Sequence, residues 1–280
     1  MYLTIDFEDF NHDLKRGLGI CSSGPINFDF LWEKYQLINN IFKKSNFGKG
    51  SFGTFFCTGI IAEKEPDLIR RIADDGHEIA CHYYFHDVMK YENLEIVENN
   101  LKKAKSLLEE ASGKTIKGFR APYFNIEKDN SSQYKIVEKL FDYDSSFACN
   151  TEEELFQFKR KMNLNSLKVI PIYEQKMAGY NFRLGGSFLK IFPKSYMNWM
   201  IKKSSKNGFV PHIYLHPYEF GNSDAFRLKI NDLSNLGLKK SIYWRIRQNQ
   251  WLKFKNNSLI KKVNYIIENN HLDGVLENLL

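Results

Sequence analysis

The sequence predicts an α/β protein with parallel strands. Short apolar segments typical of buried strands alternate with longer segments whose apolar residues have helical spacing. Charged and histidine side chains also stand where several strand-like segments end. Parallel α/β folds collect functional groups at the carboxyl ends of their strands. The 280 residues are enough for one large α/β domain or two small ones.

The individual elements follow from local patterns. Pro66 begins a helix that Gly76 ends, and Gly113 follows a long charged helix as its C-cap. We predict helices at residues 30–42, 66–75, 93–112, 134–141 and 195–203. We predict strands at residues 2–6, 52–57, 77–80, 116–119, 168–173 and 210–216, and a flexible loop at 185–187.

Composition indicates an ordinary globular protein, with 43% hydrophobic and 26% charged residues. The four cysteines (Cys21, Cys57, Cys81 and Cys149) are far apart and form no C-x-x-C pair, which fits a reducing compartment. The first residues read as a strand and not as a signal peptide, and no run approaches the ~20 apolar residues of a membrane span. We therefore expect a cytoplasmic protein.

The net charge of +7 is concentrated near the C-terminus. Residues 233–267 hold no acidic residue and eight basic ones: Lys239, Lys240, Arg245, Arg247, Lys253, Lys255, Lys261 and Lys262. One interpretation is a helical appendage whose apolar face (Leu252, Leu259, Val263, Ile266) packs on the rest of the protein. The other is a dock for anionic lipid headgroups at the inner face of the membrane, or for a substrate diphosphate. No nucleic-acid-binding motif is visible, so we expect no nucleic-acid partner.

Two clusters predict a metal centre. His82 and His86 are spaced i, i+4, which on a helical turn or a tight loop aims both rings at one point. Two imidazoles and one carboxylate are suitable ligands for a zinc-like cation. Asp6, Glu8 and Asp9 lie within four residues and would repel one another without a neutralising cation. The alternatives are chance neighbours on an aromatic surface and a solvated acidic turn.

Five motifs resemble those of polysaccharide deacetylases with a NodB homology domain (carbohydrate esterase family 4), in the family's order over residues 3–217. They are Thr4-Ile5-Asp6-Phe7-Glu8-Asp9, Gly76-His77-Glu78-Ile79 with His82 and His86, Arg120-Ala121-Pro122-Tyr123, Asp144-Ser145-Ser146 and Tyr214-Leu215-His216-Pro217. The resemblance implies a distorted (β/α)7-type barrel over residues 1–225, followed by a basic helical extension over residues 226–280 that packs on it.

The resemblance also implies the metal ligands. His82 and His86 would bind one divalent cation, for which we predict Zn²⁺, with Co²⁺, Ni²⁺ or Mn²⁺ as alternatives. The family's first motif has adjacent acids, whereas here the second acid is displaced, so either Glu8 or Asp9 could be the third ligand. A cation held in this way can acidify a water molecule and polarise a carbonyl group.

Catalytic roles follow from the same resemblance. Asp6 would be the general base that takes the proton of the attacking water, and Arg120 would keep that carboxylate ionised. The backbone N–H of Tyr123 would stabilise the oxyanion. His216 would protonate the leaving amine, with Asp144 fixing its tautomer.

The substrate that we expect is an N-acetylated amino sugar, as a sugar nucleotide or a lipid-linked glycan. Residues 168–193 resemble a subgroup linked to surface-polysaccharide assembly, so we predict N-deacetylation in O-antigen, capsule or exopolysaccharide synthesis. One alternative is hydrolysis of another amide, such as a formamide on a lipid-linked amino sugar. Another is a catalytically silent glycan-binding domain, against which the complete motifs count.

Overall fold

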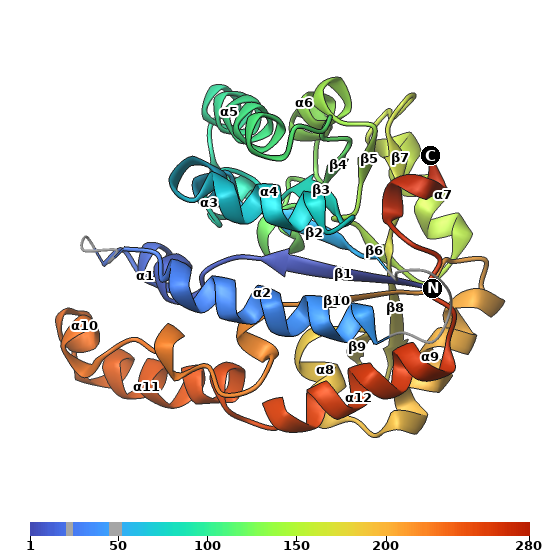
Figure 1. Ribbon diagram of the computed structural model, residues 1–280. Coiled ribbons are helices and arrows are strands. Elements are labelled where there is room, and N and C mark those ends of the chain that lie inside the picture. Colours follow the sequence, from blue (N-terminus) through green and yellow to red (C-terminus); the bar gives the residue numbers. More distant parts are fainter. Residues whose placement is uncertain (21–24, 45–51) are drawn as a thin grey trace.

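Seven parallel strands form a curled sheet through the centre of the molecule (Figure 1), in the order β10-β1-β2-β3-β4-β5-β7. The computed structural model describes residues 1–20, 25–44 and 52–280. The strands are β1 (Tyr2–Phe7), β2 (Thr54–Cys57), β3 (Glu78–Cys81), β4 (Gly118–Phe119), β5 (Tyr143–Asp144), β7 (Lys168–Val169) and β10 (His212–Leu215). This arrangement confirms the predicted (β/α)7-type barrel.

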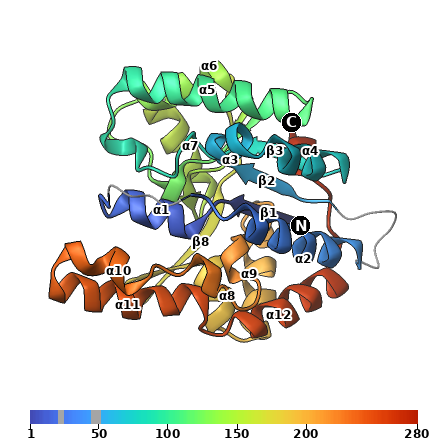
Figure 2. The same ribbon diagram turned by 60° about the vertical axis from the view of Figure 1, so that its left-hand side comes forward.

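Helices cover both sides of the sheet, with α3, α4 and α5 on one side and α11 and α12 on the other (Figures 1 and 2). Those that precede the C-terminal extension are α1 (Phe10–Gly17), α2 (Phe28–Lys43), α3 (Gly59–Lys64), α4 (Pro66–Asp74), α5 (Leu94–Ser112), α6 (Ser132–Leu140), α7 (Glu152–Lys161), α8 (Gly186–Ile191) and α9 (Lys194–Lys206). α5 shows why they form, since Val97, Leu101, Ala104 and Leu108 recur at helical spacing and are all buried. It ends at Gly113, whose φ of 65° is left-handed.

Two predictions in the middle of the chain are corrected. The segment predicted as one strand at 168–173 contains two, β7 and the start of β8 (Ile172–Met177), because Pro171 interrupts the pairing. β8 joins β6 (Ala148–Cys149) and β9 (Tyr180–Arg183) in a separate sheet. The predicted flexible loop at 185–187 is wrong, because α8 begins at Gly186. Gly185 pairs with Tyr214 so closely that a Cβ atom would lie 2.2 Å from the tyrosine ring.

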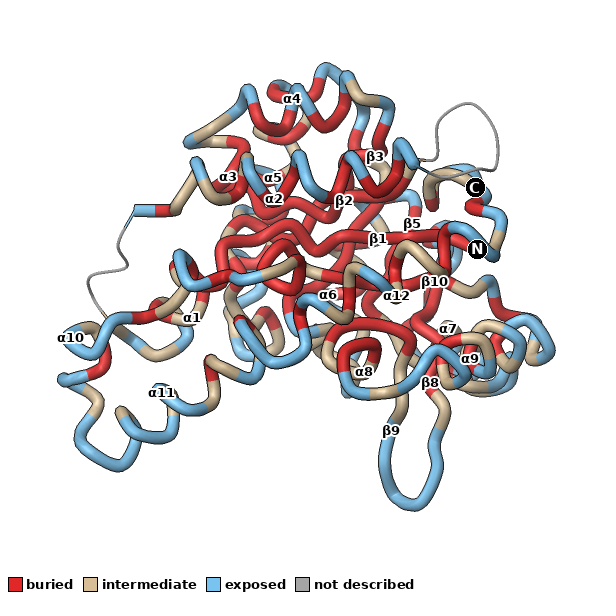
Figure 3. Tube along the Cα trace, turned by 60° about the horizontal axis from the view of Figure 1, so that its bottom comes forward, coloured by how far each residue is buried: buried red, intermediate tan, exposed pale blue. Residues whose placement is uncertain are grey.

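The C-terminal extension runs from the carboxyl ends of the strands back to their amino ends. Its α-helices are α10 (Ile230–Leu233), α11 (Leu238–Leu252) and α12 (Asn256–Asn269). α10 and α11 lie on the side toward which β1 points (Figure 1), and much of their surface is exposed (Figure 3). The four apolar residues predicted to pack inward (Leu252, Leu259, Val263, Ile266) are buried in the same core cluster as the barrel. The division of the chain at residue 225 stays a prediction.

The last residues close the amino end of the barrel. The backbone N–H groups of Asp273 and Leu276 donate to the carbonyl oxygen of Met1 (2.9 Å) and to Oγ1 of Thr54 (2.9 Å). In the described ranges, no helix has the length and apolarity that a membrane crossing requires. The cysteines at 57, 81 and 149 are buried and free, while Cys21 lies outside the described residues.

Candidate active site

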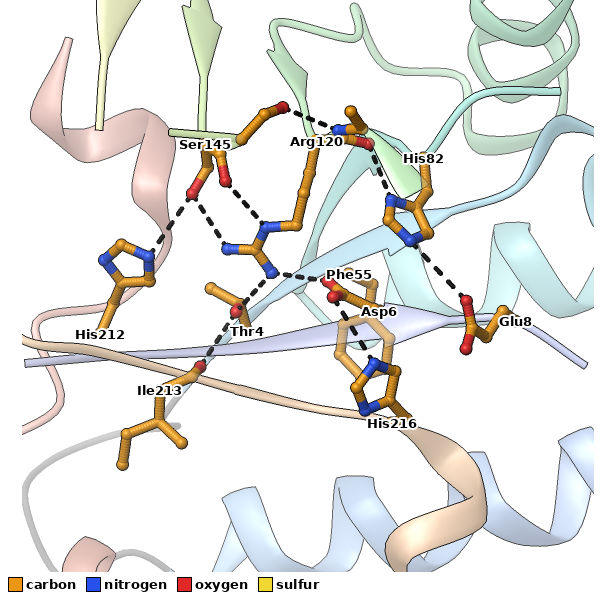
Figure 4. Close-up of polar contacts among 12 residues, drawn as sticks. Thr4, Asp6, Glu8, Phe55, His82, Arg120, Ser145, His212, Ile213 and His216 are labelled. Atoms are coloured by element: carbon orange, nitrogen blue, oxygen red, sulfur yellow. Dashed lines mark hydrogen bonds and ion pairs between the residues drawn. The ribbon is translucent and has the colours of Figure 1, made fainter. Parts of the chain in front are cut away.

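The predicted site residues meet at the carboxyl ends of the strands. Asp6 lies near the end of β1, Asp144 ends β5, and His82, Arg120 and His216 directly follow β3, β4 and β10. Because the strands are parallel and adjacent, their ends share one edge of the sheet. Figure 4 shows the Arg120 side chain between Ser145 and Asp6, with His82 and His216 on either side of this axis.

Glu8, His82 and His86 form a buried cluster suited to a metal ion. One ligand atom from each lies within 4.8 Å of the others. Glu8 Oε2 is 2.6 Å from His86 Nε2 and 3.7 Å from His82 Nε2. This carboxylate oxygen is buried and lacks a hydrogen-bond partner in the described structure. A buried oxygen of that kind between two imidazoles fits a cation, and the set of two His and one carboxylate is typical of catalytic zinc.

The electrostatics of the cluster act differently on its two histidines. Burial lowers the pKa of His82 to about 4, so this imidazole is neutral at pH 7, as a ligand must be. Burial alone would raise the pKa of Glu8, but the charge of His86, whose Nε2 lies 2.6 Å away, outweighs it and lowers the pKa. Glu8 is therefore ionised although it is buried. Burial would lower the pKa of His86, but the charge of Glu8 raises it overall, so binding of a cation would release a proton from this imidazole.

A strained loop presents the two histidines. Residues 82–88 form a loop and not a helical turn, and Tyr83 within it has a φ of +68°. Left-handed backbone at a non-glycine residue costs about 1–3 kcal/mol and is found where the surrounding structure fixes it, often at functional sites. His82 Nδ1 lies 2.7 Å from the carbonyl oxygen of Arg120. This contact fixes the tautomer and leaves Nε2 free to face Glu8.

Asp9 has a different role from Glu8. Its Oδ1 accepts hydrogen bonds from the backbone N–H groups of Asn11 (2.8 Å) and His12 (3.0 Å), and its Oδ2 accepts one from Asn27 (2.7 Å). Asp9 is thus the N-cap of α1 and does not enter the cluster. Successive side chains of an extended strand alternate between its faces, so Asp6 and Glu8 share one face. Of the two candidate ligands, the structure brings only Glu8 to the histidines.

Arg120 and Asp6 form a fully buried ion pair. Arg120 Nη1 donates to Asp6 Oδ1 (2.5 Å) and to Thr4 Oγ1 (2.9 Å), while Ser145 accepts from Nε and Nη2 through its carbonyl and hydroxyl oxygens. Burial by itself raises the pKa of Asp6, but the charge of Arg120, with smaller contributions from both nearby histidines, lowers it overall. The geometry therefore holds Asp6 as an oriented carboxylate.

His216 faces Asp6 and is held from behind by Glu219. Its Nε2 lies 3.8 Å from Asp6 Oδ2, and its Nδ1 lies 3.0 Å from Glu219 Oε2. Burial lowers the pKa of His216, but the hydrogen bond and charge of Glu219, followed by the charges of Glu8 and Asp6, raise it to about 9. Sequence reasoning missed Glu219. The available signal was an acid three residues after the histidine, in a turn that contains Pro217.

The predicted pairing of Asp144 with His216 is wrong. Asp144 is fully buried and accepts hydrogen bonds from the backbone N–H (3.0 Å) and hydroxyl of Ser146. The Ser146 hydroxyl oxygen in turn accepts from the backbone N–H of Ala121 (2.8 Å). Asp144 therefore supports the segment that carries Arg120. Asp144 cannot fix the tautomer of His216, because Glu219 already contacts Nδ1 of that histidine.

Tyr123 lies beside the cluster with its ring centroid 4.3 Å from that of His86. Tyr123 and Phe124 have φ values of 55° and 57°, so this segment is also strained. The oxyanion role of the Tyr123 N–H stays a prediction.

A buried lysine connects the site to the C-terminal extension. Lys190 of α8 donates to the carbonyl oxygens of Gln250 (3.2 Å) and Trp251 (2.9 Å) at the end of α11. Its Nζ also lies 3.8 Å from Glu219 Oε1. The cavity above the cluster is lined by Trp244 and Trp251 of α11, together with Asp6, Glu8, His82, His86 and His216. The extension is therefore part of the site.

Fold and site define an α/β barrel with a candidate metal centre of the kind that hydrolases use. Residues 26–138 match the family model described as polysaccharide deacetylase, and residues 143–265 match a domain of unknown function (DUF3473). The chain therefore contains a domain of the polysaccharide deacetylase family at residues 26–138. The first match begins after Asp6 and Glu8, and His216 falls within the second.

Relatives of known designation share parts of the chain. It is 37% identical over 73 residues to a peptidoglycan-N-acetylglucosamine deacetylase of Bacillus cereus, which is 26% of each chain. It is 27% identical over 143 residues to a peptidoglycan deacetylase of Helicobacter pylori, which is 51% of this chain and 43% of that protein. The chain thus spans less than half the length of these relatives.

A solved structure shares the fold. A protein of Mycobacterium smegmatis assigned to the polysaccharide deacetylases aligns with a TM-score of 0.57 and 16% identity, over 99% of this chain and 88% of that one. At this identity the likeness concerns the fold alone.

Proposed function

We propose that the protein hydrolyses the N-acetyl group of an amino sugar, with a divalent cation held by Glu8, His82 and His86. The observation that carries this proposal is the approach of an ionised carboxylate and a charged imidazole, Asp6 and His216, in the cavity that holds the cluster. Amide hydrolysis needs a base for the attacking water and an acid for the leaving amine. The family match and the designations of the relatives support the reaction.

The protein's own groups would perform the proton transfers. Asp6 takes a proton from water, while Arg120 keeps its second oxygen engaged and its charge stable. His216 donates from Nε2 to the departing nitrogen, because Glu219 holds the proton on Nδ1. The Tyr123 N–H would support the developing oxyanion. A bound Zn²⁺, or Co²⁺, Ni²⁺ or Mn²⁺ in its place, would supply the acidification of water and polarisation of the carbonyl group.

The Glu219→Gln variant should shift the alkaline limb of the pH–rate profile to lower pH. The folded-state pKa of His216 is about 9, so the acid form is present below pH 9 and is lost as the pH rises through that value. Removing the Glu219 charge removes the largest contribution that raises this pKa, and a shift of about one pH unit or more is expected. Asp224→Asn, an exposed carboxylate paired with Lys253, is the matched control. Superimposable limbs for Glu219→Gln and the parent protein would contradict the role of Glu219.

The biological setting that we propose is the synthesis of O-antigen, capsule or exopolysaccharide in the cytoplasm. The substrate would be a sugar nucleotide or a lipid-linked glycan before export. The relatives' designations refer instead to peptidoglycan, which makes N-acetylglucosamine polymers the second substrate class to test. A formamide on a lipid-linked amino sugar would suit the same groups.

Mass spectrometry of reaction products would test the function. The purified protein would be incubated with N-acetylated nucleotide sugars, lipid-linked sugars, peptidoglycan fragments and an N-formyl sugar. We expect a mass loss equal to the replacement of one acetyl group by hydrogen, and none after chelation of the metal. Binding of glycans without any product would favour a silent glycan-binding domain instead.

The outer face of α11 supports a membrane contact near the site. Leu238, Ile242 and Ile246 recur every four residues and are 77%, 50% and 66% exposed. Exposed Lys239 and Arg245 lie on or beside this face. A helix that presents apolar and cationic side chains together fits the interface of an anionic membrane, where each cation contributes on the order of 1 kcal/mol.

Not all eight cations of the extension are available for this contact. Lys262 Nζ donates to the carbonyl oxygens of Leu189 (2.8 Å), Lys190 (3.0 Å) and Phe192 (2.7 Å), at the end of α8. Lys253 pairs with Asp224. The proposed membrane surface is therefore the exposed face of α11.

Vesicle co-sedimentation would test this surface. The parent protein should bind anionic vesicles at low salt and bind less at high salt, because the charges are screened beyond ~8 Å at physiological ionic strength. Replacing Lys239, Lys240 and Arg245 with Gln should reduce binding several-fold. The same change at Lys202, Lys203 and Lys206 of α9 is the matched control. Equal binding of the parent to neutral and anionic vesicles, or none, would refute the membrane contact.

A further inference from the structure

The wall of the catalytic cavity contributed by α11 is aromatic. The cavity has a volume of about 350 Å³, within the range of small-molecule sites, and Trp244 and Trp251 line it together with the metal cluster. Both tryptophans are only partly buried, so ring surface stays accessible. Nothing in the proposed proton transfers uses either of them.

The tryptophans lie at the far end of a series of ring contacts that begins at the catalytic histidine. The ring of Tyr218 stacks on His216 with centroids 4.8 Å apart. Phe10 follows at 4.9 Å from Tyr218, and Trp251 at 5.5 Å from Phe10. Trp244 is the last, 6.2 Å from Trp251 and inclined by only 24°. The tryptophan pair is thus separated from the reacting groups by two intervening rings.

Trp251 is held in place before any ligand binds, and Trp244 stacks on it. Buried Lys190 restricts the end of α11, because it donates hydrogen bonds to the carbonyl oxygens of Gln250 and Trp251. The Arg247 guanidinium lies 4.2 Å from the Trp251 ring centroid. Rings fixed in this way lose little conformational entropy on binding.

Arg183 adds a polar group to the same cavity. Its Nε donates to Glu174 (2.6 Å), and its side chain is 27% exposed. A guanidinium oriented by a carboxylate can still donate from its terminal nitrogens to hydroxyl or carboxylate oxygens. The cavity therefore combines aromatic faces with a donor, which suits a sugar ring with apolar C–H faces and polar edges.

We infer that Trp244 and Trp251 form a subsite for a second sugar ring, next to the ring whose acetamide lies at the metal cluster. This inference rests on the proposed function and defines its substrate class as a glycan of at least two rings. A single amino sugar would reach the cluster, Tyr123 and Tyr218 but leave the tryptophan pair uncovered. The C-terminal extension then selects for chain length.

Calorimetric titration separates binding from catalysis. The probes are N-acetylglucosamine and its β-1,4-linked disaccharide and tetrasaccharide, titrated into the zinc-loaded Asp6→Asn variant so that turnover during the titration is slowed by roughly 10²-fold. We expect the disaccharide to bind at least tenfold more tightly than the monosaccharide. Adding Trp244→Ala or Trp251→Ala should lower the affinity for the disaccharide about tenfold. Trp251→Phe should keep part of that affinity. Trp199→Ala, which removes an exposed tryptophan of α9 outside the cavity, is the matched control.

The outcomes distinguish the subsite from the function on which it rests. Equal affinity for the three saccharides, or unchanged disaccharide affinity in both alanine variants, would overturn the subsite while leaving deacetylation of single amino sugars intact. If the parent protein, which retains Asp6, hydrolyses none of these saccharides and the Asp6→Asn variant binds none, both the proposed function and the subsite fail. Thermal denaturation of each variant shows whether α11 has kept its fold.

Discussion

Replacing His82 or His86 with Ala, or Glu8 with Gln, is expected to remove both the bound metal and the activity. The three ligand atoms converge within 4.8 Å, and an open three-ligand site loses most of its affinity when one donor is lost. The parent protein should carry about one divalent cation per chain after loading with zinc. Each variant should carry far less, and its rate of deacetylation should fall to the background rate.

Asp9→Asn is the matched control for this experiment. Asparagine caps helices as well as aspartate does, so α1 should persist, although the hydrogen bond from the Asn27 N–H to the second oxygen is lost. The cluster does not include this residue. Mass spectrometry of metal content, measured beside the rate, decides the ligand. Full occupancy in Glu8→Gln together with loss of metal in Asp9→Asn would overturn the assignment of Glu8, and full occupancy in both histidine variants would overturn the metal centre.

Asp6→Asn is expected to lower the rate by roughly 10²-fold or more while the metal stays bound. Asp6 Oδ2 lies 3.8 Å from His216 Nε2, and Asp6 is not one of the three candidate metal ligands. An amide in its place cannot take a proton from water. Steady-state rates and metal content of the same preparation check the prediction, and near-parent turnover would show that another group is the base.

The variant also leaves Arg120 buried opposite a neutral partner. Breaking a buried pair costs about 3–5 kcal/mol, so loss of rate could come from unfolding. Thermal denaturation of Asp6→Asn must therefore show a folded protein. His216→Ala gives an independent route, since this side chain lies at the edge of the cavity with 16% exposure and should also cost about 10²-fold with the fold intact.

Local sequence predicted the barrel because its strands and helices have clear periods and stops. The same patterns placed Asp6, His82 and Arg120 correctly, since each directly follows or ends an apolar segment. The choice between Glu8 and Asp9 could not be made in this way. It depends on which acid shares a strand face with Asp6 and which one caps the following helix, and both are consequences of where β1 ends.

Contacts between distant segments were beyond the sequence patterns. Asp144 was paired with His216 by resemblance, but the backbone turn after β10 brings Glu219 to that histidine first. In the sequence, Trp244 and Trp251 lie in the basic segment 233–267, and nothing there indicates a place in the active site. Only the path of α11 across the carboxyl ends of the strands shows that they line the cavity.

The position of Lys190 has a consequence for how this protein can be divided and recombined. Its ammonium group is almost completely shielded from water, and two of its partners are backbone carbonyls that no side-chain substitution can restore. A truncated chain that ends near residue 225 would remove these partners and leave the charge beside Glu219, the glutamate that orients His216. A chimera carrying the last fifty residues of a related protein would have to place the carbonyl oxygens at the end of α11 within hydrogen-bond distance of Lys190. We therefore expect His216, Glu219 and the C-terminal helices to be retained or lost together among related proteins. The boundary between the two family matches lies earlier, between residues 138 and 143.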